Sequence, residues 1–149
     1  MSPTIEFANN DDLPNILALL ENSHLPTEGL QDHLATTLIA LQSGQIVGSV
    51  ALEIYGSAAL LRSLAVDSNV HRQGLGQQLT KAALDLAKTF SVQEVYLLTE
   101  TASEFFPRFG FKSILRTEVA PAIHSSVEWS SACPVTAQAM VLHIQAEKV

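Results

Sequence analysis

The spacing of apolar residues changes several times along the chain, and each change predicts a new element. Ile5 and Phe7 open a short strand. Residues 13–20 then carry leucine and isoleucine at the i, i+3, i+4, i+7 spacing of one helix face, behind capping residues 9–12. A second, shorter helix is expected from after Pro26 to about Ala35. The N-terminal part therefore reads as one strand followed by two helices.

From Thr36 the pattern becomes that of a sheet. Residues 38–41 and 46–52 flank a tight turn at Ser43-Gly44, which indicates a hairpin, and residues 59–66 add a third antiparallel strand. Residues 75–90 form the clearest amphipathic helix, and residues 92–99 follow as a strand with a near-continuous apolar end. A strand, a long helix and a strand in succession predict a right-handed crossover with a parallel pair.

The last third of the chain is less regular. We expect a short helix around Phe105 that ends at Gly110, and final strands at residues 111–115 and 137–144. The intervening residues 116–136 are too long for an ordinary loop in a small domain. This segment is therefore either functional or contains structure that the pattern does not reveal.

Composition and charge limit the function. The 149 residues suit one domain spanning 1–149, and 47% hydrophobic with 15% charged residues is a globular composition. The formal charge of −7 makes nucleic acid and membrane partners unfavourable. No apolar run is long enough to cross a membrane, the first residues do not resemble a signal peptide, and Cys133 is the only cysteine. We expect a soluble, cytoplasmic protein.

The chemistry is suggested by residues 64–79, where a strand ends at Val66 and a seven-residue loop leads to Gly74 and Gly76 at a helix start. Glycines let the backbone approach a ligand closely. Unsatisfied N–H groups and the helix dipole attract anions there without any net positive charge on the protein. The pattern suits a pyrophosphate, to which Arg72 can add one contact.

Other interpretations of the two glycines remain to be weighed. One alternative is that the two glycines only allow the chain to turn into a helix and bind nothing. A dinucleotide-binding fold needs a third glycine at position 79, which is Leu79, and its first glycine closer to the strand end. A phosphate-binding loop with Gly-Lys-Ser/Thr is absent.

The segment resembles the acetyl-CoA motif of the GNAT superfamily of N-acetyltransferases, Gln/Arg-x-x-Gly-x-Gly/Ala after a Leu-x-Val strand. Leu64, Val66, Gly74 and Gly76 match, whereas His71 departs from the Gln/Arg position. Residues 105–111, Phe-Phe-Pro-Arg-Phe-Gly-Phe, resemble the family's helix-to-strand signature Phe-Tyr-x-x-x-Gly-Phe. The order of elements fits over nearly the whole chain. The resemblance implies an α/β fold with a mixed, mostly antiparallel sheet of about seven strands and helices on both faces.

The resemblance also implies a binding site for acetyl-CoA. The backbone of β-strand residues 64–66 would bind the pantetheine arm, the amides of residues 72–77 would hold the pyrophosphate, and the thioester would lie where the strands ending at Val66 and Thr99 splay apart. The residues implied for the coenzyme are Leu64, Ala65, Val66, His71, Arg72, Gln73, Gly74, Leu75, Gly76, Gln77 and Phe106.

A closer similarity suggests the acceptor. Residues 97–106 and 128–134 resemble GNAT proteins associated with arsenic resistance operons, and the Leu-Leu-Thr…Phe-Phe…Gly-Phe part also resembles amino-acid N-acetyltransferases that acetylate glutamate. Both resemblances imply an acceptor that is a small amine, specifically an amino acid or amino-acid analogue. They also allow a homodimer, because the C-terminal strands of such folds often pair or swap.

The expected catalytic groups depart from the family. Phe106 stands where many relatives have a tyrosine acid, and Arg62 where many have a glutamate base. Arg62 either holds the acceptor's carboxylate or forms a surface ion pair with Glu53 or another acid. Glu53 is the best-placed base on the neighbouring strand, and the alternative is an ordinary solvated carboxylate. Tyr96 reads as a packing residue.

Several residues have no assigned chemistry. Trp129 either lines an acceptor pocket or covers the core, and Cys133 reads as a buried packing residue. No histidines are paired at a metal-ligand spacing, so no metal is expected. Three other functions stay open. The chain could be a non-catalytic acyl-CoA sensor, a protein or peptide acetyltransferase, or a nucleotide-binding domain.

Overall fold

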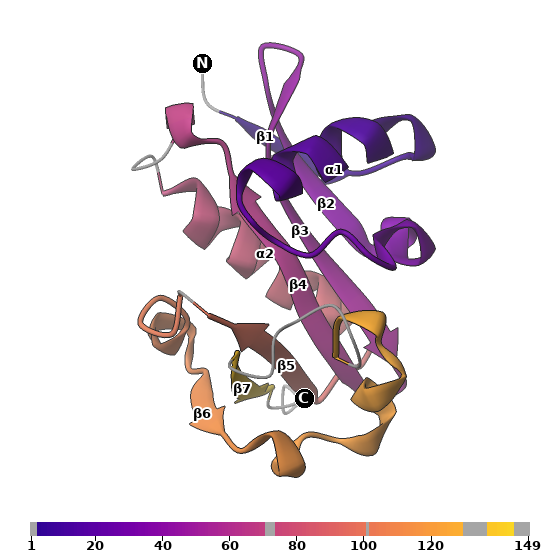
Figure 1. Cartoon of the computed structure of the whole chain (residues 1–149), viewed down its shortest axis with the longest axis vertical. Helices are drawn as coiled ribbons and strands as arrows, with labels where there is room; N and C mark the ends of the chain where they lie inside the picture. Colours follow the sequence, from indigo (N-terminus) through magenta and orange to yellow (C-terminus); the bar gives the residue numbers. More distant parts are fainter. Residues whose placement is uncertain (1–2, 71–73, 101, 130–136, 145–149) are drawn as a thin grey trace.

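A seven-stranded sheet forms the centre of the described structure (Figure 1). The structure is a computed structural model that describes residues 3–70, 74–100, 102–129 and 137–144. The strands lie in the order β1-β2-β3-β4-β5-β7-β6. Their bounds are Thr4–Phe7 (β1), Thr37–Gln42 (β2), Gln45–Tyr55 (β3), Ala58–Val66 (β4), Glu94–Thr99 (β5), Lys112–Ile114 (β6) and Gln138–His143 (β7).

The predicted sheet is confirmed in its main features. β2, β3 and β4 form the antiparallel meander, and β4 pairs in parallel with β5 across the helix α2 (Leu75–Thr89). The remaining pairs, including β5 with β7 and β7 with β6, are antiparallel. The last strand of the sequence therefore enters the sheet between β5 and β6, and β5 becomes a central strand, as its apolar run predicts.

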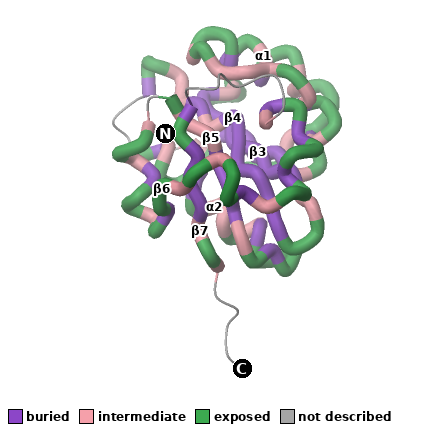
Figure 2. The backbone as a smooth tube through the Cα atoms, turned by 60° about the horizontal axis from the view of Figure 1, so that its bottom comes forward, coloured by how far each residue is buried: buried purple, intermediate pink, exposed green. Residues whose placement is uncertain are grey.

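Helices cover both faces of this sheet, and the strands are buried between them (Figure 2). α2 packs on one face, where Leu75, Leu79 and Ala83 meet the alternate apolar residues of β3 to β5. On the other face, α1 (Leu13–Asn22) packs over β2 to β4, and the segment of residues 116–129 packs over β4, β5 and β7. The second face therefore has two apolar clusters, one at each end.

Residues 127–129 have α- or π-helical backbone, and the other helical elements of the described residues are short 3₁₀ turns. They cover Asn10–Asp12, Leu30–Thr36, Ser68–Val70, Phe106–Phe109, Arg116–Glu118 and Pro121–Ser125. The helix expected from Pro26 to Ala35 is wrong in its start, because Gly29 has a φ of 80° and the helical turn begins only at Leu30. The expected short helix at Phe105 is confirmed as the turn Phe106–Phe109, which Gly110 ends.

β4 is bent by a bulge at the point where it leaves its neighbour β5. Ser49 pairs with Ala65 and Ala51 with Arg62, so the two residues Ser63 and Leu64 of β4 stand opposite one residue of β3. Ser63 has a φ of 61°, a conformation that few non-glycine residues adopt.

The pairing of β4 with β5 ends at Leu60 and Tyr96, although β4 continues to Val66 and β5 to Thr99. The two parallel strands therefore separate toward their C-terminal ends, as the resemblance to the GNAT superfamily implies.

Candidate active site

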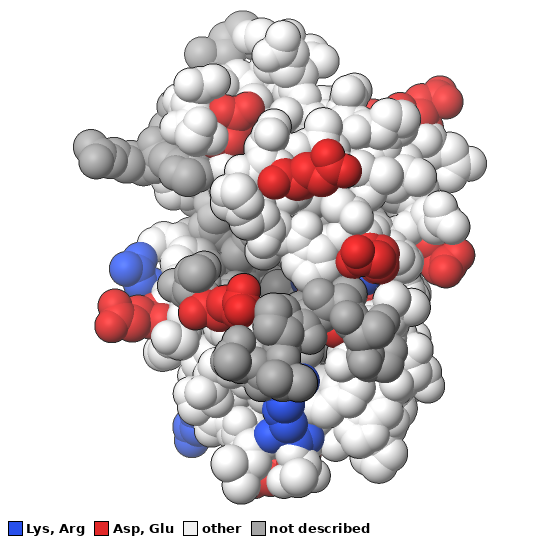
Figure 3. All heavy atoms as spheres, viewed as in Figure 1, with Lys and Arg blue, Asp and Glu red and all other residues white. Residues whose placement is uncertain are grey.

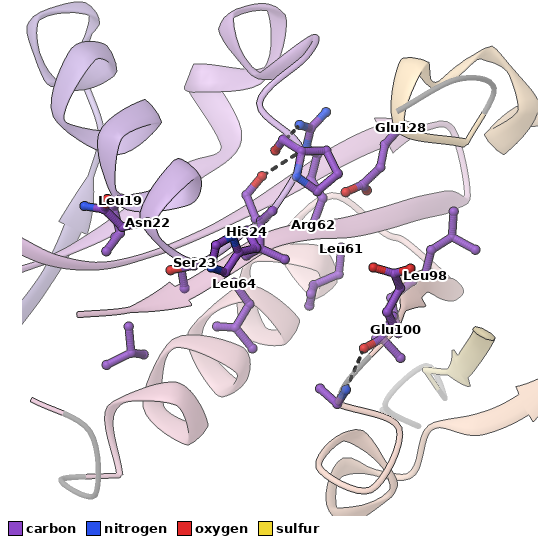
Figure 4. A pocket seen from close by; sticks show the side chains of 18 of the residues that line it. Leu19, Asn22, Ser23, His24, Leu61, Arg62, Leu64, Leu98, Glu100 and Glu128 are labelled. Carbon is purple, nitrogen blue, oxygen red and sulfur yellow. Dashed lines mark hydrogen bonds between the residues drawn. The ribbon is translucent and has the colours of Figure 1, made fainter. Parts of the chain in front are cut away.

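A cavity of about 930 Å³ opens where β4 and β5 separate (Figure 4). Its walls come from residues 61–69, from residues 97–100 at the end of β5, and from the end of α1 with the loop that follows. Phe106 and Glu128 add two further parts of the wall. Figure 3 shows that acidic side chains are spread over the face of Figure 1, with Lys and Arg mostly toward its lower part.

The predicted coenzyme residues of β4 lie along this cavity. Leu64, Ala65 and Val66 line it, and so does the buried Phe106 of the turn Phe106–Phe109. Phe106 packs edge to face against Phe105 and Phe111, which fixes its ring. The structure therefore brings the strand and the aromatic residue of the two sequence motifs to one cavity.

The predicted phosphate-binding residues begin α2. Gly74 precedes the helix with a φ of 74°, and the first hydrogen bond of the helix runs from the Gln78 N–H to the Gly74 carbonyl. The N–H groups of Leu75, Gly76 and Gln77 precede that bond, so the helix itself supplies them no acceptor. They are available to an anion at the helix start. His71, Arg72 and Gln73 lie outside the described residues.

The start of α2 packs against two apolar neighbours. A Cβ added at Gly76 would lie 3.7 Å from the Phe105 ring and 3.9 Å from Val66 Cγ2, which is ordinary van der Waals contact, so packing there does not require glycine. The backbone N–H groups of residues 75–77 fit the pyrophosphate of the coenzyme that the motif implies.

Arg62 and Glu53 form a buried ion pair on the opposite side of the sheet from α2. Arg62 Nη1 donates to Glu53 Oε2 at 2.9 Å, and the residues are 2% and 1% exposed. Arg62 Nε also donates to Ser63 Oγ at 3.0 Å, and Nη2 to the Pro26 carbonyl at 3.4 Å. The ion pair between Arg62 and Glu53 is confirmed. It is buried, however, so the expected surface position of the pair and the expected solvated carboxylate of Glu53 are both wrong. The helical turn Leu30–Thr36 and the segment 116–129 cover this face.

The carboxylate of Glu53 is held by several donors. Tyr55 donates its hydroxyl to Oε1 at 2.5 Å, and His33 Nε2 lies 3.5 Å from the same oxygen. Burial by itself raises the pKa of Glu53, but hydrogen bonds from Tyr55, Arg62 and Ser126 and the charge of His33 outweigh burial, so that its pKa is lowered. The pKa of Tyr55 is raised by burial and by its bond to Glu53.

Arg62 and Glu53, the two predicted catalytic residues, lie differently with respect to the cavity. Arg62 lines the cavity, whereas Glu53 is not among the residues of its wall. A guanidinium has five N–H donors, and the described residues use three of those of Arg62. Glu53 holds the guanidinium in place, and the Arg62 side chain is fully buried.

Two residues of this site are missed by the sequence pattern. Ser63 pins the bulge, because Ser49 donates its hydroxyl to the Ser63 carbonyl at 2.8 Å while Arg62 donates to the Ser63 hydroxyl. Glu128 is 4% exposed and lines the cavity from the segment 116–129. The only signal for Glu128 in the sequence is its place in the run 128–134 that resembles other GNAT proteins.

The other residues singled out in the sequence have structural contacts. Tyr96 is buried and donates its hydroxyl to Glu94 Oε2, as expected of a packing residue. Trp129 stacks on His124 with ring centroids 4.8 Å apart, packs against the cluster around Leu60 and is not part of the cavity wall. Trp129 therefore covers the core. Cys133 lies outside the described residues.

The described part of the chain also bears on metals and membranes. Within it, no three His, Cys, Asp or Glu residues come together as a metal site. None of its helices is long and apolar enough to span a bilayer.

Comparison with protein families gives a consistent result. The model of the acetyltransferase (GNAT) domain matches residues 33–113, which is more than half of the chain. An amino-acid acetyltransferase of Mycobacterium tuberculosis is 28% identical over 132 residues, which cover 81% of this chain and 75% of the relative. An uncharacterised N-acetyltransferase of Chlorobaculum tepidum is 34% identical over 88 residues, but the match covers only 58% of this chain and 56% of that protein.

Solved structures share the fold at low sequence identity. N-acetylglutamate synthase of Neisseria gonorrhoeae, crystallised with coenzyme A and N-acetylglutamate, superposes with a TM-score of 0.82 at 21% identity. The match covers 98% of this chain but 36% of that one. Rv2747 of Mycobacterium tuberculosis, also crystallised with CoA, gives a TM-score of 0.81 at 23% identity over 96% of this chain and all of that one.

Proposed function

Because the chain belongs to the GNAT family of acetyltransferases, we propose that it transfers the acetyl group of acetyl-CoA to the amine of an amino acid or an amino-acid analogue. Enzymes of this family are N-acetyltransferases, and acetyl-CoA is the donor that their domain uses. The finer part of the proposal is the acceptor, which we infer from the residues that line the cavity.

The observation that carries the proposal is the placement of Arg62 in the wall of the same cavity as the coenzyme-binding strand. Arg62 lines the cavity together with Leu64, Ala65 and Val66. Its planar guanidinium suits a carboxylate, and two of its five N–H groups are not used by Glu53, Ser63 or Pro26. An amino acid would place its carboxylate at Arg62 and its amine beside the end of β4.

The same wall carries groups of the opposite charge. Glu100 and Glu128 line the cavity on the side of β5 and the segment 116–129. A cation on one side and carboxylates on another match a zwitterion, which carries both charges within one small molecule. The amino-acid acetyltransferase and the N-acetylglutamate synthase found by comparison are consistent with such an acceptor.

The chain's own residues then have separate tasks. The amides at the start of α2 bind the pyrophosphate, and the backbone of Leu64 to Val66 aligns the pantetheine arm. Phe106 is buried in the cavity wall and cannot donate a proton, so it does not act as the acid. We propose that Glu53 acts by holding Arg62 and not as the base, because its pKa is lowered and it does not line the cavity.

The single cysteine of the sequence supports a reducing compartment, and we propose a cytoplasmic location. The acidic composition supports a small-molecule acceptor over nucleic acid.

The test is release of CoA thiol from acetyl-CoA with a panel of acceptors. We expect free amino acids, including glutamate and its phosphinic and arsenic analogues, to be acetylated faster than simple alkylamines of the same length. The panel includes basic peptides, and faster acetylation of peptides would replace the amino-acid proposal with protein acetylation. Tight CoA binding without turnover of any acceptor would indicate a sensor domain.

A further inference from the structure

Glu128 is the buried carboxylate of the cavity wall. It is 4% exposed, whereas Glu28 and Glu100, which also line the cavity, are exposed. Figure 4 shows its side chain pointing from the segment 116–129 into the cavity. Glu128 thus faces the interior of the site, and the other two carboxylates stand nearer to solvent.

The position of Glu128 is fixed by its own segment. The Ser126 hydroxyl accepts the N–H groups of Glu128 at 3.1 Å and of Trp129 at 3.4 Å. The segment is held to the sheet by Val119 and Ile123, which are buried against Leu60 and Tyr96. These contacts fix the backbone from which the Glu128 side chain extends, and a firmly held backbone is what a catalytic group requires.

We infer that Glu128 is the general base that takes the proton of the acceptor's amine, an inference that rests on the proposed function. The other titratable residues of the cavity wall fit this task less well. Glu28, Glu100 and His24 are exposed, Asp67 accepts the N–H of Asn69 on the coenzyme side, and Arg62 is a cation.

Arg62 and Glu128, the two buried charged residues of the described wall, give the acceptor a direction. Arg62 comes from β4 and Glu128 from the segment 116–129, so they reach the cavity from different elements. An amino acid whose carboxylate meets Arg62 then turns its amine toward Glu128 and toward the separated ends of β4 and β5. Acceptors without a carboxylate lack this orientation.

The proton balance of the reaction is complete with one base. The amine enters as an ammonium group, and Glu128 takes one proton and leaves a neutral nitrogen. The lone pair of this nitrogen forms a bond to the thioester carbonyl carbon while the bond from that carbon to sulfur breaks. The second nitrogen proton ends on the sulfur as a thiol, and Glu128 returns its proton to water. No oxidant or further reactant is needed.

The experiment compares Glu128→Gln with the wild-type chain at fixed acetyl-CoA. We expect kcat/KM for the preferred amino acid to fall by about 100-fold or more, mainly through kcat, because general base catalysis contributes factors of this size. We expect CoA binding and the thermal unfolding midpoint to stay close to wild type. Glu128→Asp retains a carboxylate and should keep part of the activity that Gln loses.

The pH profile separates a base from a structural role. We expect wild-type kcat/KM to rise with pH both because the acceptor's ammonium group loses its proton and because the base is free to accept one, and we expect the Glu128→Gln profile to keep only the contribution of the acceptor. The other charged or titratable groups at the cavity or around Arg62 are His24, Glu28, His33, Glu53, Tyr55, Arg62, Asp67 and Glu100, and all are unchanged in the variant. Glu118→Gln is the matched control, because Glu118 is exposed on the same segment, and it should behave as wild type.

Two results would overturn the inference. One is a folded Glu128→Gln variant with wild-type kcat and an unchanged pH profile. The other is a rise in KM alone, which would make Glu128 an anchor for the ammonium group and not a base. If the wild-type chain binds CoA but acetylates no acceptor, the proposed function fails first, and the role of Glu128 fails with it.

Discussion

The ion pair of Glu53 and Arg62 lies on the face of the sheet opposite α2, between two apolar clusters. Their atoms Oε2 and Nη1 lie 2.9 Å apart, between the apolar cluster under α1 and the cluster under the segment 116–129. Through its other donors Arg62 also contacts the Pro26 carbonyl and the bulge residue Ser63. The pair therefore connects the loop after α1, the bulge of β4 and, through Ser126 and Glu53, the segment that carries Glu128.

The first prediction concerns the strength of this pair. Arg62→Met leaves the buried Glu53 without its cation and should lower the free energy of unfolding by about 3–5 kcal/mol. The double variant Arg62→Met with Glu53→Gln should lose less than the sum of the two single variants, because both charges are gone. Urea unfolding of the four proteins at neutral pH measures this coupling. Simple additivity would mean that the two charges do not interact.

The second prediction concerns acid. The pKa of Glu53 is lowered below its ordinary value of 4.5 in the folded protein, so the folded state favours the ionised carboxylate. The stabilisation from this group is therefore present above pH 4.5 and is lost as the pH falls through the lower folded pKa.

Glu53→Gln should accordingly be less stable than wild type at neutral pH, and the difference should shrink as the pH drops below 4.5. Unfolding in urea at a series of pH values measures the difference. Glu6→Gln, at an exposed position of β1, is the control and should follow wild type throughout. A constant difference at all pH values would contradict the linkage.

The third prediction concerns the acceptor. Arg62→Lys keeps a cation near Glu53 but loses the planar pair of donors. We expect KM to rise by about 10–100-fold for acceptors with a carboxylate, since hydrogen bonds to charged groups contribute about 1.5–3 kcal/mol. KM for an alkylamine without a carboxylate should change little. An equal rise for both classes of acceptor would remove the carboxylate from the proposal.

The fold of residues 37–99 could be predicted from the sequence alone. Apolar spacing is enough to predict β2 to β5 and α2, because each of these elements buries a regular set of side chains. Gly74, Gly76 and Phe106 predict the coenzyme site from the sequence, because backbone groups and short local motifs form that site.

The acceptor side could not be predicted in the same way. Glu53 and Arg62 are buried only because the turn Leu30–Thr36 and the segment 116–129 fold over them, and neither shows a long apolar period. Ser63 accepts a hydrogen bond from Arg62 because the β-bulge places it there, and that bulge depends on how β4 pairs with β3. Glu128 reaches the cavity through an irregular segment, where no periodicity gives a side chain's direction.

The fourth prediction compares two glycines that have the same backbone conformation. Gly74 and Gly44 have φ values of 74° and 77°, and an added Cβ at either position meets no atom within 4 Å. Replacing either glycine with alanine should therefore lower the free energy of unfolding by about 1–2 kcal/mol, because the left-handed backbone is unfavourable for alanine. Their places differ, since Gly74 precedes α2 and Gly44 turns β2 into β3.

Gly74→Ala should therefore raise KM for acetyl-CoA several-fold, because the amides at the start of α2 change direction when the backbone relaxes. Gly44→Ala should lose similar stability with no change in that KM. Urea unfolding and initial rates at varied acetyl-CoA measure both effects. If the two variants lose the same stability and neither changes KM, the start of α2 does not bind the coenzyme, and its glycines serve only to begin the helix.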